Sequence, residues 1–160
     1  ACPKSGFRTH IHNDREAVKV LRSPERLIFK VHGCIRRDTG SLVLAMSDYH
    51  AMRAERPHCL QLLEAVFATH TALFVGFSMS DPDLQLVLQN VNIAFPLAQP
   101  HILFASESLH PAVQAAMEAS LNLKFVTYPK GDHAAGLEQL RQLSKDVESL
   151  RASRLSTLLV

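Results

Sequence analysis

The sequence predicts an α/β fold, with a doubly wound parallel sheet that carries helices on both faces. Short apolar segments alternate with longer segments that have the 3.6-residue period of helices, which is typical of right-handed βαβ units. The apolar segments are continuous, as in strands that are covered on both faces. A chain of 160 residues is also long enough to bury one core of its own.

The first part of the chain is predicted to hold few regular elements. Residues 1–26 are polar, and we expect no strong strand there and only a short helix over 14–21. An apolar strand follows over 27–32. After the turn signal at 38–40, a second short strand is expected over 41–45.

Residues 34–70 are interpreted as a small hairpin and helical insertion. Ser47 is suited to cap a helix that begins at Asp48. Pro57 is tolerated in a first helical turn, so helical structure is expected to continue past it. The apolar period of this second stretch comes from Leu60, Leu63 and Phe67.

From residue 71 onward, strands and helices are predicted to alternate regularly. Ser80 is expected to cap the first of these helices, with Pro82 in its first turn. Residues 27–150 would form the domain itself, and residues 151–160 a tail or the end of the last helix. The predicted strands cover 71–77, 101–106 and 123–128, and the predicted helices cover 81–91, 111–121 and 134–150.

The composition is that of a globular protein, and it excludes several classes. The net charge is only +2 and the basic residues are spread along the chain, so we see no electrostatic footprint for nucleic acid. Three cysteines without a CxxC pair argue against a disulfide scaffold or a cysteine-rich zinc site. No apolar run approaches the roughly 18 residues that span a bilayer, and we expect a soluble, cytoplasmic protein without a membrane partner.

The chain opens with Ala-Cys-Pro-Lys-Ser-Gly, without an initiating Met and without a secretion signal. We therefore expect it to be the remainder of a longer polypeptide. On this interpretation the predicted sheet is incomplete at its N-terminus, and residues 1–26 follow a missing upstream part.

Candidate binding residues follow the predicted strands, because ligands of open α/β sheets bind outside the carboxyl ends of the strands. His32 ends the strand predicted over 27–32, and Gly33 follows it. The further candidates, in chain order, are Gly76, Phe77, Ser78, Asp81, Ser106, Glu107, Tyr128, Gly131, Asp132 and His133.

The turn GFSMSD, residues 76–81, has features that suit a nucleotide. Gly76 allows a ligand to approach the backbone closely. Ser78 offers a hydroxyl, and the N–H groups of the following helix point toward the same place. A tight turn before a capped helix explains the same residues without a ligand, and Asp81 has an ordinary role as an acid that stabilises the helix dipole.

His32 also has two interpretations, since a histidine at the end of a strand is often structural and its usual pKa equally suits a general base. Other chemistries are less well supported by the sequence. His10, His12 and Asp14 form an H-x-H-x-D pattern that could bind a metal, but no companion motif accompanies it. GFSMS lacks the second glycine of a GxSxG nucleophile elbow, and neither GxGxxG nor GxxxxGK[ST] is present.

Taken in order, the motifs resemble the second half of a sirtuin-type domain. They are KVHG (30–33), LVLAMSDYHAM (42–52), LFVGFSMSDPDL (73–84), HILFASES (101–108) and FVTYPKGDH (125–133). Within this family the chain is most similar to the bacterial branch that cleaves NAD in antiviral defence. The four-cysteine zinc module of a deacylase is replaced by the insertion, so the resemblance implies no zinc and disfavours a deacylase. It also implies a Rossmann-like sheet.

The resemblance implies roles for several of these residues in cleaving the nicotinamide–ribose bond of NAD, which is then the substrate. His32 matches the general base. Gly76 and Ser78 match a turn that contacts ribose and phosphates, and Ser106 stands where sirtuins often have an Asn on the adenosine ribose. The loop beside adenine corresponds to Gly131, Asp132 and His133.

The chain departs from the family in lacking the Gly-rich first turn and the catalytic Asn, both of which belong upstream of His32. Asn13 lies too close in sequence to be that Asn. We therefore expect NAD+ hydrolysis only if the upstream half of the site is supplied. The alternative is a non-catalytic module that binds NAD or ADP-ribose, or that assembles with copies of itself or with other defence subunits.

Overall fold

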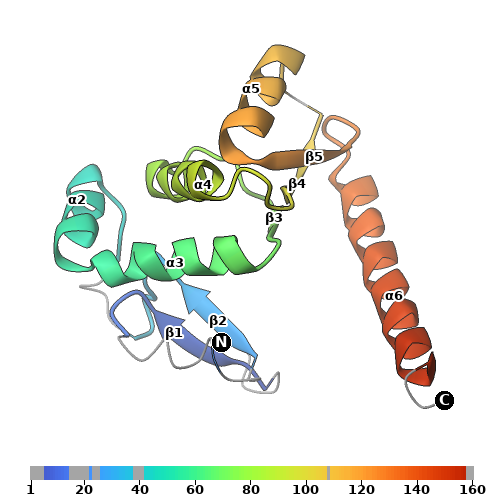
Figure 1. The fold of residues 1–160 in the computed structure, drawn as a ribbon, viewed down its shortest axis with the longest axis horizontal. Helices are drawn as coiled ribbons and strands as arrows, with labels where there is room; N and C mark the ends of the chain where they lie inside the picture. Colours follow the sequence, from blue (N-terminus) through green and yellow to red (C-terminus); the bar gives the residue numbers. More distant parts are fainter. Residues whose placement is uncertain (1–5, 15–21, 23–25, 38–41, 108, 158–160) are drawn as a thin grey trace. The chain divides into compact units, whose positions relative to one another are not determined.

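The computed structural model describes residues 6–14, 22, 26–37, 42–107 and 109–157. The helix predicted over 14–21, the turn at 38–40 and Ser108 lie outside these residues, apart from Asp14. The chain divides into two compact units. Unit 1 comprises Ala1–His70 and Asp81–Pro96, and unit 2 comprises Thr71–Ser80 and Leu97–Val160. Figure 1 labels the helices and strands along the chain.

Unit 1 contains a two-stranded parallel sheet among its described residues. Strand β1 (Arg8–Ile11) pairs with β2 (Leu27–Lys30), with Arg8 opposite Leu27. The expectation of no strong strand before residue 27 is therefore wrong. Three of the four residues in RTHI are polar, which suits a strand that is partly exposed along most of its length. Its pairing with β2 could therefore not be predicted from local hydrophobicity.

Helices α2 (Met46–Glu55) and α3 (Pro57–Thr69) follow, and they are separated at Arg56. The strand predicted over 41–45 is absent from 42–45, the part that the structure describes. The carboxylate of Asp48 accepts hydrogen bonds from the N–H groups of Leu44 and Ala45, so these groups serve a helix start instead of a strand ladder. The cap position is therefore Ala45, and the predicted cap at Ser47 is wrong.

Helix α4 (Pro82–Ala94) is the last helix along the chain in unit 1. Its N-cap is Asp81, which corrects the prediction of Ser80. A buried cluster of Val43, Met52 and Cys59 forms a core in this unit. The partly buried side chains that pack against the cluster are Phe29, Val31, Tyr49 and Leu60.

Unit 2 is built on a three-stranded parallel sheet in the order β3-β4-β5. Strand β3 (Leu73–Val75) is shorter than the predicted 71–77, because Gly76 adopts a φ of +65° and ends the extended segment. Strands β4 (His101–Ser106) and β5 (Leu123–Tyr128) agree with the prediction. They pair in register over their whole length, from His101 opposite Leu123 to Ser106 opposite Tyr128.

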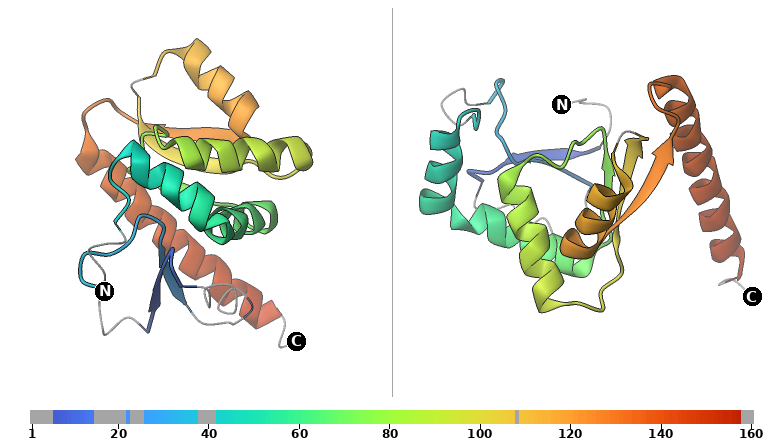
Figure 2. Two further views of the ribbon diagram at one scale, coloured as in Figure 1. Left: turned by 90° about the vertical axis from the view of Figure 1, so that its left-hand side faces the viewer. Right: turned by 90° about the horizontal axis from the view of Figure 1, so that it is seen from above.

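The two helices of unit 2 lie on opposite faces of this sheet (Figure 2). Helix α5 (Pro111–Leu121) contributes Met117 to a cavity that Leu103 and Phe125 also line. Helix α6 (His133–Thr157) contributes Leu140 and Leu143 to a cavity on the other face, which Ile102 and Val126 also line. The predicted α/β fold with a doubly wound parallel sheet is therefore confirmed, and α6 extends through much of the residues predicted as a tail.

Candidate functional site

His32 lies in the turn that follows β2, with Val31 between it and the last strand residue, so β2 is shorter than the strand predicted over 27–32. Gly33 takes a φ of +85°, and its N–H donates to the carbonyl of Lys30. This positive φ suits glycine and turns the chain sharply after the strand. The His32 side chain stays 40% exposed, and its Nε2 lies 3.0 Å from Oδ2 of Asp81. The end of β2 thus presents an accessible imidazole that is paired with a carboxylate.

Asp81 has both carboxylate oxygens engaged within unit 1. As the N-cap of α4 it accepts hydrogen bonds at Oδ1 from the backbone N–H groups of Asp83 and Leu84, each at 3.0 Å. Its other oxygen, Oδ2, faces His32. The side chain is only 9% exposed. The helix cap therefore fixes the carboxylate that pairs with the imidazole.

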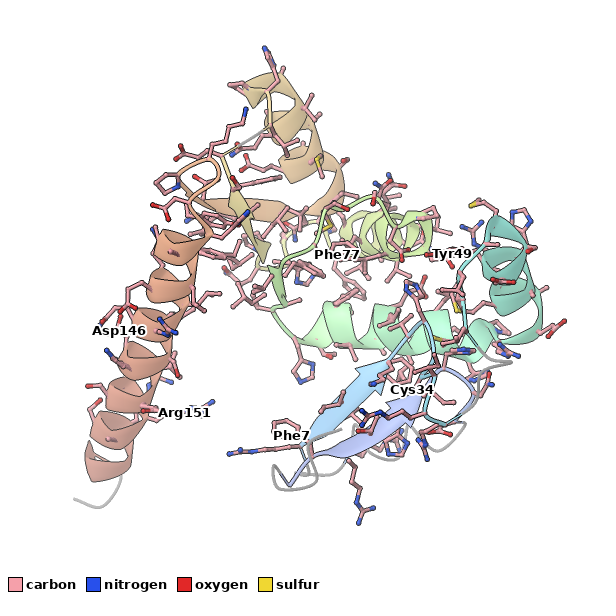
Figure 3. The ribbon with its side chains drawn as sticks, turned by 180° about the vertical axis from the view of Figure 1, so that it is seen from behind. Phe7, Cys34, Tyr49, Phe77, Asp146 and Arg151 are labelled. Carbon is pink, nitrogen blue, oxygen red and sulfur yellow. The ribbon has the colours of Figure 1, made fainter. Side chains whose placement is uncertain are left out.

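Tyr49 on α2 is a third member of this group, and Figure 3 labels it. Its hydroxyl donates to Oδ2 of Asp81 at 3.4 Å. Its ring meets the His32 ring edge to face, with centroids 5.4 Å apart. Burial, together with the negative charge of Asp81, raises the pKa of Tyr49. Tyr49 is not among the site residues that the sequence predicts, since only the fold brings it to Asp81.

A second ion pair joins the same two helices one turn further along α2. Arg53 on α2 contacts Oδ1 of Asp83 on α4, and the Asp83 side chain is almost fully buried. Burial raises the pKa of the nearby Cys59 thiol to about 11, and the charge of Asp83 adds to this effect. The Cys59 thiol therefore stays protonated at neutral pH and behaves as a core residue.

In unit 2, five of the predicted binding residues line one cavity of about 360 Å³. The cavity lies where the parallel strands end, which is the place that the topology favours for a ligand. Apolar side chains of β4, β5 and α5 form much of its lining, including Leu103 and Met117. The predicted residues that line it are Gly76, Phe77, Ser78, Ser106 and Tyr128.

Hydrogen bonds connect this cavity to the loop after β5. The N–H of Gly131 donates to Oγ of Ser106 at 3.4 Å, and the Tyr128 hydroxyl lies 3.0 Å from Nδ1 of His133. Asp132 instead accepts from the N–H of Ala135, and so supports the start of α6. The predicted loop residues are thus brought to the end of the sheet, with Asp132 facing its own helix.

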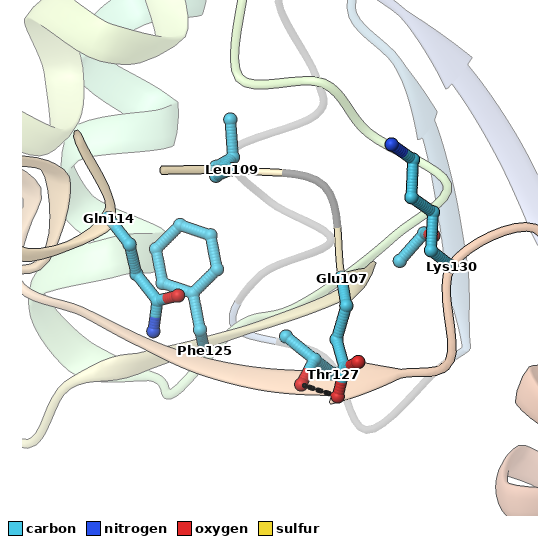
Figure 4. Close-up of a pocket in the computed structure, with 7 residues that line it drawn as sticks. Glu107, Leu109, Gln114, Phe125, Thr127 and Lys130 are labelled. Atoms are coloured by element: carbon cyan, nitrogen blue, oxygen red, sulfur yellow. Dashed lines mark hydrogen bonds between the residues drawn. The ribbon is translucent and has the colours of Figure 1, made fainter. Parts of the chain in front are cut away.

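A second, more polar pocket of about 280 Å³ lies beside the end of β5 (Figure 4). Ser106 and Phe125 line both this pocket and the first cavity. Oε1 of Glu107 accepts a hydrogen bond from the Thr127 hydroxyl at 3.3 Å. Lys130 supplies a cation to the lining. This pocket therefore offers both signs of charge next to the predicted ribose residue Ser106.

The alternative metal pattern takes a different form in the structure. Nδ1 of His10 lies 3.3 Å from the Asp14 carboxylate, which also pairs with Arg37. His12 is buried, with its Nδ1 3.4 Å from the guanidinium of Arg56. Cations thus contact two members of the pattern. Among the described residues, no three His, Cys, Asp or Glu side chains are grouped so as to hold a metal ion.

No helix in the described part of the chain combines the length and apolar character needed to cross a membrane. The predicted site residues fall into two groups, each described within its own unit. His32, Gly33 and Asp81 belong to unit 1. The remaining predicted residues belong to unit 2, and they gather at the carboxyl ends of its strands.

Comparisons with known proteins identify the family. Residues 4–126 match the family model described as a SIR2-like domain. The chain is 30% identical over 71 residues to the NAD(+) hydrolase ThsA of Bacillus cereus, a match that covers 44% of this chain and 15% of that protein. It is 30% identical over 90 residues to the defense-associated sirtuin 2 of Bacillus subtilis, over 55% of this chain and 9% of that protein.

The chain thus spans only a small fraction of the length of these relatives. The family match, in contrast, covers most of the chain, including β2, the turn after β3 and most of β5. The resemblance seen in the sequence motifs is confirmed: the chain belongs to the family of SIR2-like domains.

Proposed function

We propose that this chain takes part in cleaving NAD+ at the bond between nicotinamide and ribose, in a defence protein. The observation that carries the proposal is the cavity at the carboxyl ends of β3, β4 and β5. Five residues that the motifs nominated for NAD line it together. The names of the two relatives, a NAD(+) hydrolase and a defense-associated sirtuin, supply the reaction and its setting.

The cavity of unit 2 would hold the adenosine part of NAD. Gly76 has no heavy atom near the position that a Cβ would occupy, so its backbone is open to a ribose or phosphate group. The hydroxyls of Ser78 and Ser106 would bind ribose oxygens, and the apolar lining would receive adenine. On the side of the loop after β5, the adenosine would be flanked by Tyr128, Gly131 and His133. Phe77 and Asp132 are proposed to support these contacts.

His32 would act as the general base. The bond between C1′ of the ribose and the nicotinamide nitrogen breaks, and the bonding electrons leave with nicotinamide. Water attacks the resulting oxocarbenium-like carbon while His32 accepts its proton, which gives ADP-ribose, nicotinamide and H+. A positioned base contributes about 10²–10⁴-fold to such a step. Because Gly33 has no side chain, it would leave room for the substrate beside the backbone of His32.

The test is nicotinamide release from NAD+ by the protein that contains this chain, measured by chromatography. His32→Ala is expected to reduce the rate by about 10²-fold or more, with an unchanged circular dichroism spectrum. His50→Ala is the matched control, since His50 is exposed on α2 and has no role in the proposed site. Release at the wild-type rate by His32→Ala would exclude His32 as the base.

A binding module is the second candidate function, because the whole cavity lies within unit 2, whereas His32 belongs to unit 1. Such a module would bind NAD or ADP-ribose without turnover, or serve in assembly with other subunits. Calorimetry with both nucleotides separates the cases. Binding without nicotinamide release favours the module, and no heat with either nucleotide would exclude both nucleotide functions for this chain.

A further inference from the structure

The His32 imidazole is held from two sides by residues that come from different elements of unit 1. Asp81, at the start of α4, lies 3.0 Å from Nε2. Tyr49, on α2, donates to the same carboxylate oxygen, and its ring makes a T-shaped contact with the imidazole ring. The same carboxylate oxygen thus lies opposite Nε2 of His32 and accepts the hydrogen bond of the Tyr49 hydroxyl. His32 is therefore contacted both at Nε2 and by the ring of Tyr49.

The carboxylate itself is kept in place by the backbone of α4. Its Oδ1 accepts two N–H groups at the helix start, so only Oδ2 is available for His32. Because a neutral imidazole carries one proton, a proton on Nε2 that is donated to Asp81 leaves Nδ1 as the acceptor. With 40% of its side chain exposed, His32 can offer that nitrogen to a ligand.

Tyr49 is in turn fixed by its surroundings. It packs against the buried cluster of Val43, Met52 and Cys59. Arg53, one turn further along α2, pairs with buried Asp83 and so ties the same helix face to α4. Burial and the charge of Asp81 raise the pKa of Tyr49, so its hydroxyl remains a donor at neutral and moderately alkaline pH.

We propose that Asp81 and Tyr49 are positioning residues for His32, and that Nδ1 of His32 is the atom that accepts the proton. The proposal rests on the proposed function of His32 as a base. It also changes the role of Asp81. Since both of its oxygens are occupied by protein groups, Asp81 acts on the histidine and does not bind the nucleotide.

The decisive variant is Asp81→Asn. An Asn side chain keeps one oxygen for the two N–H groups of α4 and caps helices as well as Asp does, so the fold is retained. Its NH₂ group then takes the place of Oδ2 and donates to Nε2. That donor forces the proton of the neutral imidazole onto Nδ1 and removes the proposed acceptor.

The first measurement needs no substrate. Long-range ¹H–¹⁵N correlation spectra at about pH 8, where an ordinary histidine is neutral, report which ring nitrogen carries the proton. We expect Nε2–H in the wild-type protein and Nδ1–H in Asp81→Asn. Asp48→Asn is the matched control, because Asp48 caps α2 through Leu44 and Ala45; its spectrum should keep Nε2–H. Nδ1–H in the wild-type protein, or an unchanged tautomer in Asp81→Asn, would overturn the proposal.

The second measurement is the kinetics of nicotinamide release. A positioning residue affects kcat and leaves KM nearly unchanged, whereas a nucleotide ligand raises KM. We expect Asp81→Asn to lower kcat about a hundredfold or more and Tyr49→Phe to lower it about tenfold. A rise in KM alone would overturn the proposal. If the wild-type protein releases no nicotinamide, the proposed function fails, and the spectra still decide whether Asp81 sets the tautomer.

Discussion

His101 begins the central strand of unit 2 and is 2% exposed. Its Nδ1 accepts a hydrogen bond of 3.1 Å from the N–H of Ala72, and burial lowers its pKa. In the unfolded chain the imidazole titrates near its ordinary value of about 6.5. As the pH falls through that value, the unfolded state binds the proton first, so the stability of the fold decreases in mild acid.

A substitution at this residue tests the effect. His101→Asn places a side-chain oxygen near the position of Nδ1 and removes the titrating group. We expect the urea midpoint of the wild-type protein to fall more between pH 7 and pH 5 than that of His101→Asn. Urea unfolding followed by circular dichroism measures both midpoints. Equal losses of stability in the two proteins would show that His101 does not cause the acid sensitivity.

For single residues, the sequence predicts which side chains lie at strand ends but not which groups they contact. His32 and Ser106 could be nominated because each follows a strong apolar strand, and ligands favour that edge. The roles of Tyr49 and Asp81 could not be predicted, since their contacts with His32 join distant segments of the chain. Local patterns carry no signal for a hydrogen bond that only the tertiary fold creates.

At the scale of elements, helices α2 and α4 are joined by the ion pair between Arg53 and Asp83, and we expect this pair to stabilise the fold. Arg53→Met keeps the apolar stem but leaves the carboxylate of Asp83 buried without its cation. We expect a loss of roughly 3 kcal/mol in the free energy of unfolding, at the lower end for a broken buried pair, because Arg53 is 34% exposed. Denaturant unfolding measures this loss.

A double variant provides the control for that prediction. Adding Asp83→Asn to Arg53→Met replaces the buried charge with a neutral amide, and we expect part of the lost stability to return. Arg53→Lys keeps a cation and should lie close to the wild type. An Arg53→Met protein as stable as the wild type would mean that the pair contributes nothing to holding α2 on α4.

Whole elements were predictable where local and tertiary preferences agree. Strands β4 and β5 and helix α5 match the prediction because continuous apolar strands and a proline in the first helical turn are strong local signals. The region before α2 differs from the prediction. The apolar run at 42–45 has the pattern of a strand, but the N–H groups of Leu44 and Ala45 donate to the carboxylate of Asp48. Helix α4 begins one residue later than predicted. Asp81 and Ser80 are equally good N-cap residues, and the structure uses Asp81.

Across the whole molecule, the two units differ in how their sheets are supported. Strand β4 is bonded on both sides, whereas β1 and β2 form a sheet of two strands among the described residues. We therefore expect the amides of β4 to exchange with solvent more slowly than those of β1, by roughly tenfold or more. Hydrogen–deuterium exchange followed by mass spectrometry measures both rates. Equal protection in β1 and β4 would contradict this ranking.

The chain passes from unit 2 back to unit 1 between Ser80 and Asp81. One peptide bond therefore separates the end of the GFSMS turn, whose Gly76 and Ser78 line the cavity, from the carboxylate that holds His32. A molecule that tightens the turn acts on a backbone that continues directly into the cap of α4. On the proposed function, binding of the nucleotide and positioning of the base would therefore depend on adjacent residues of one short segment.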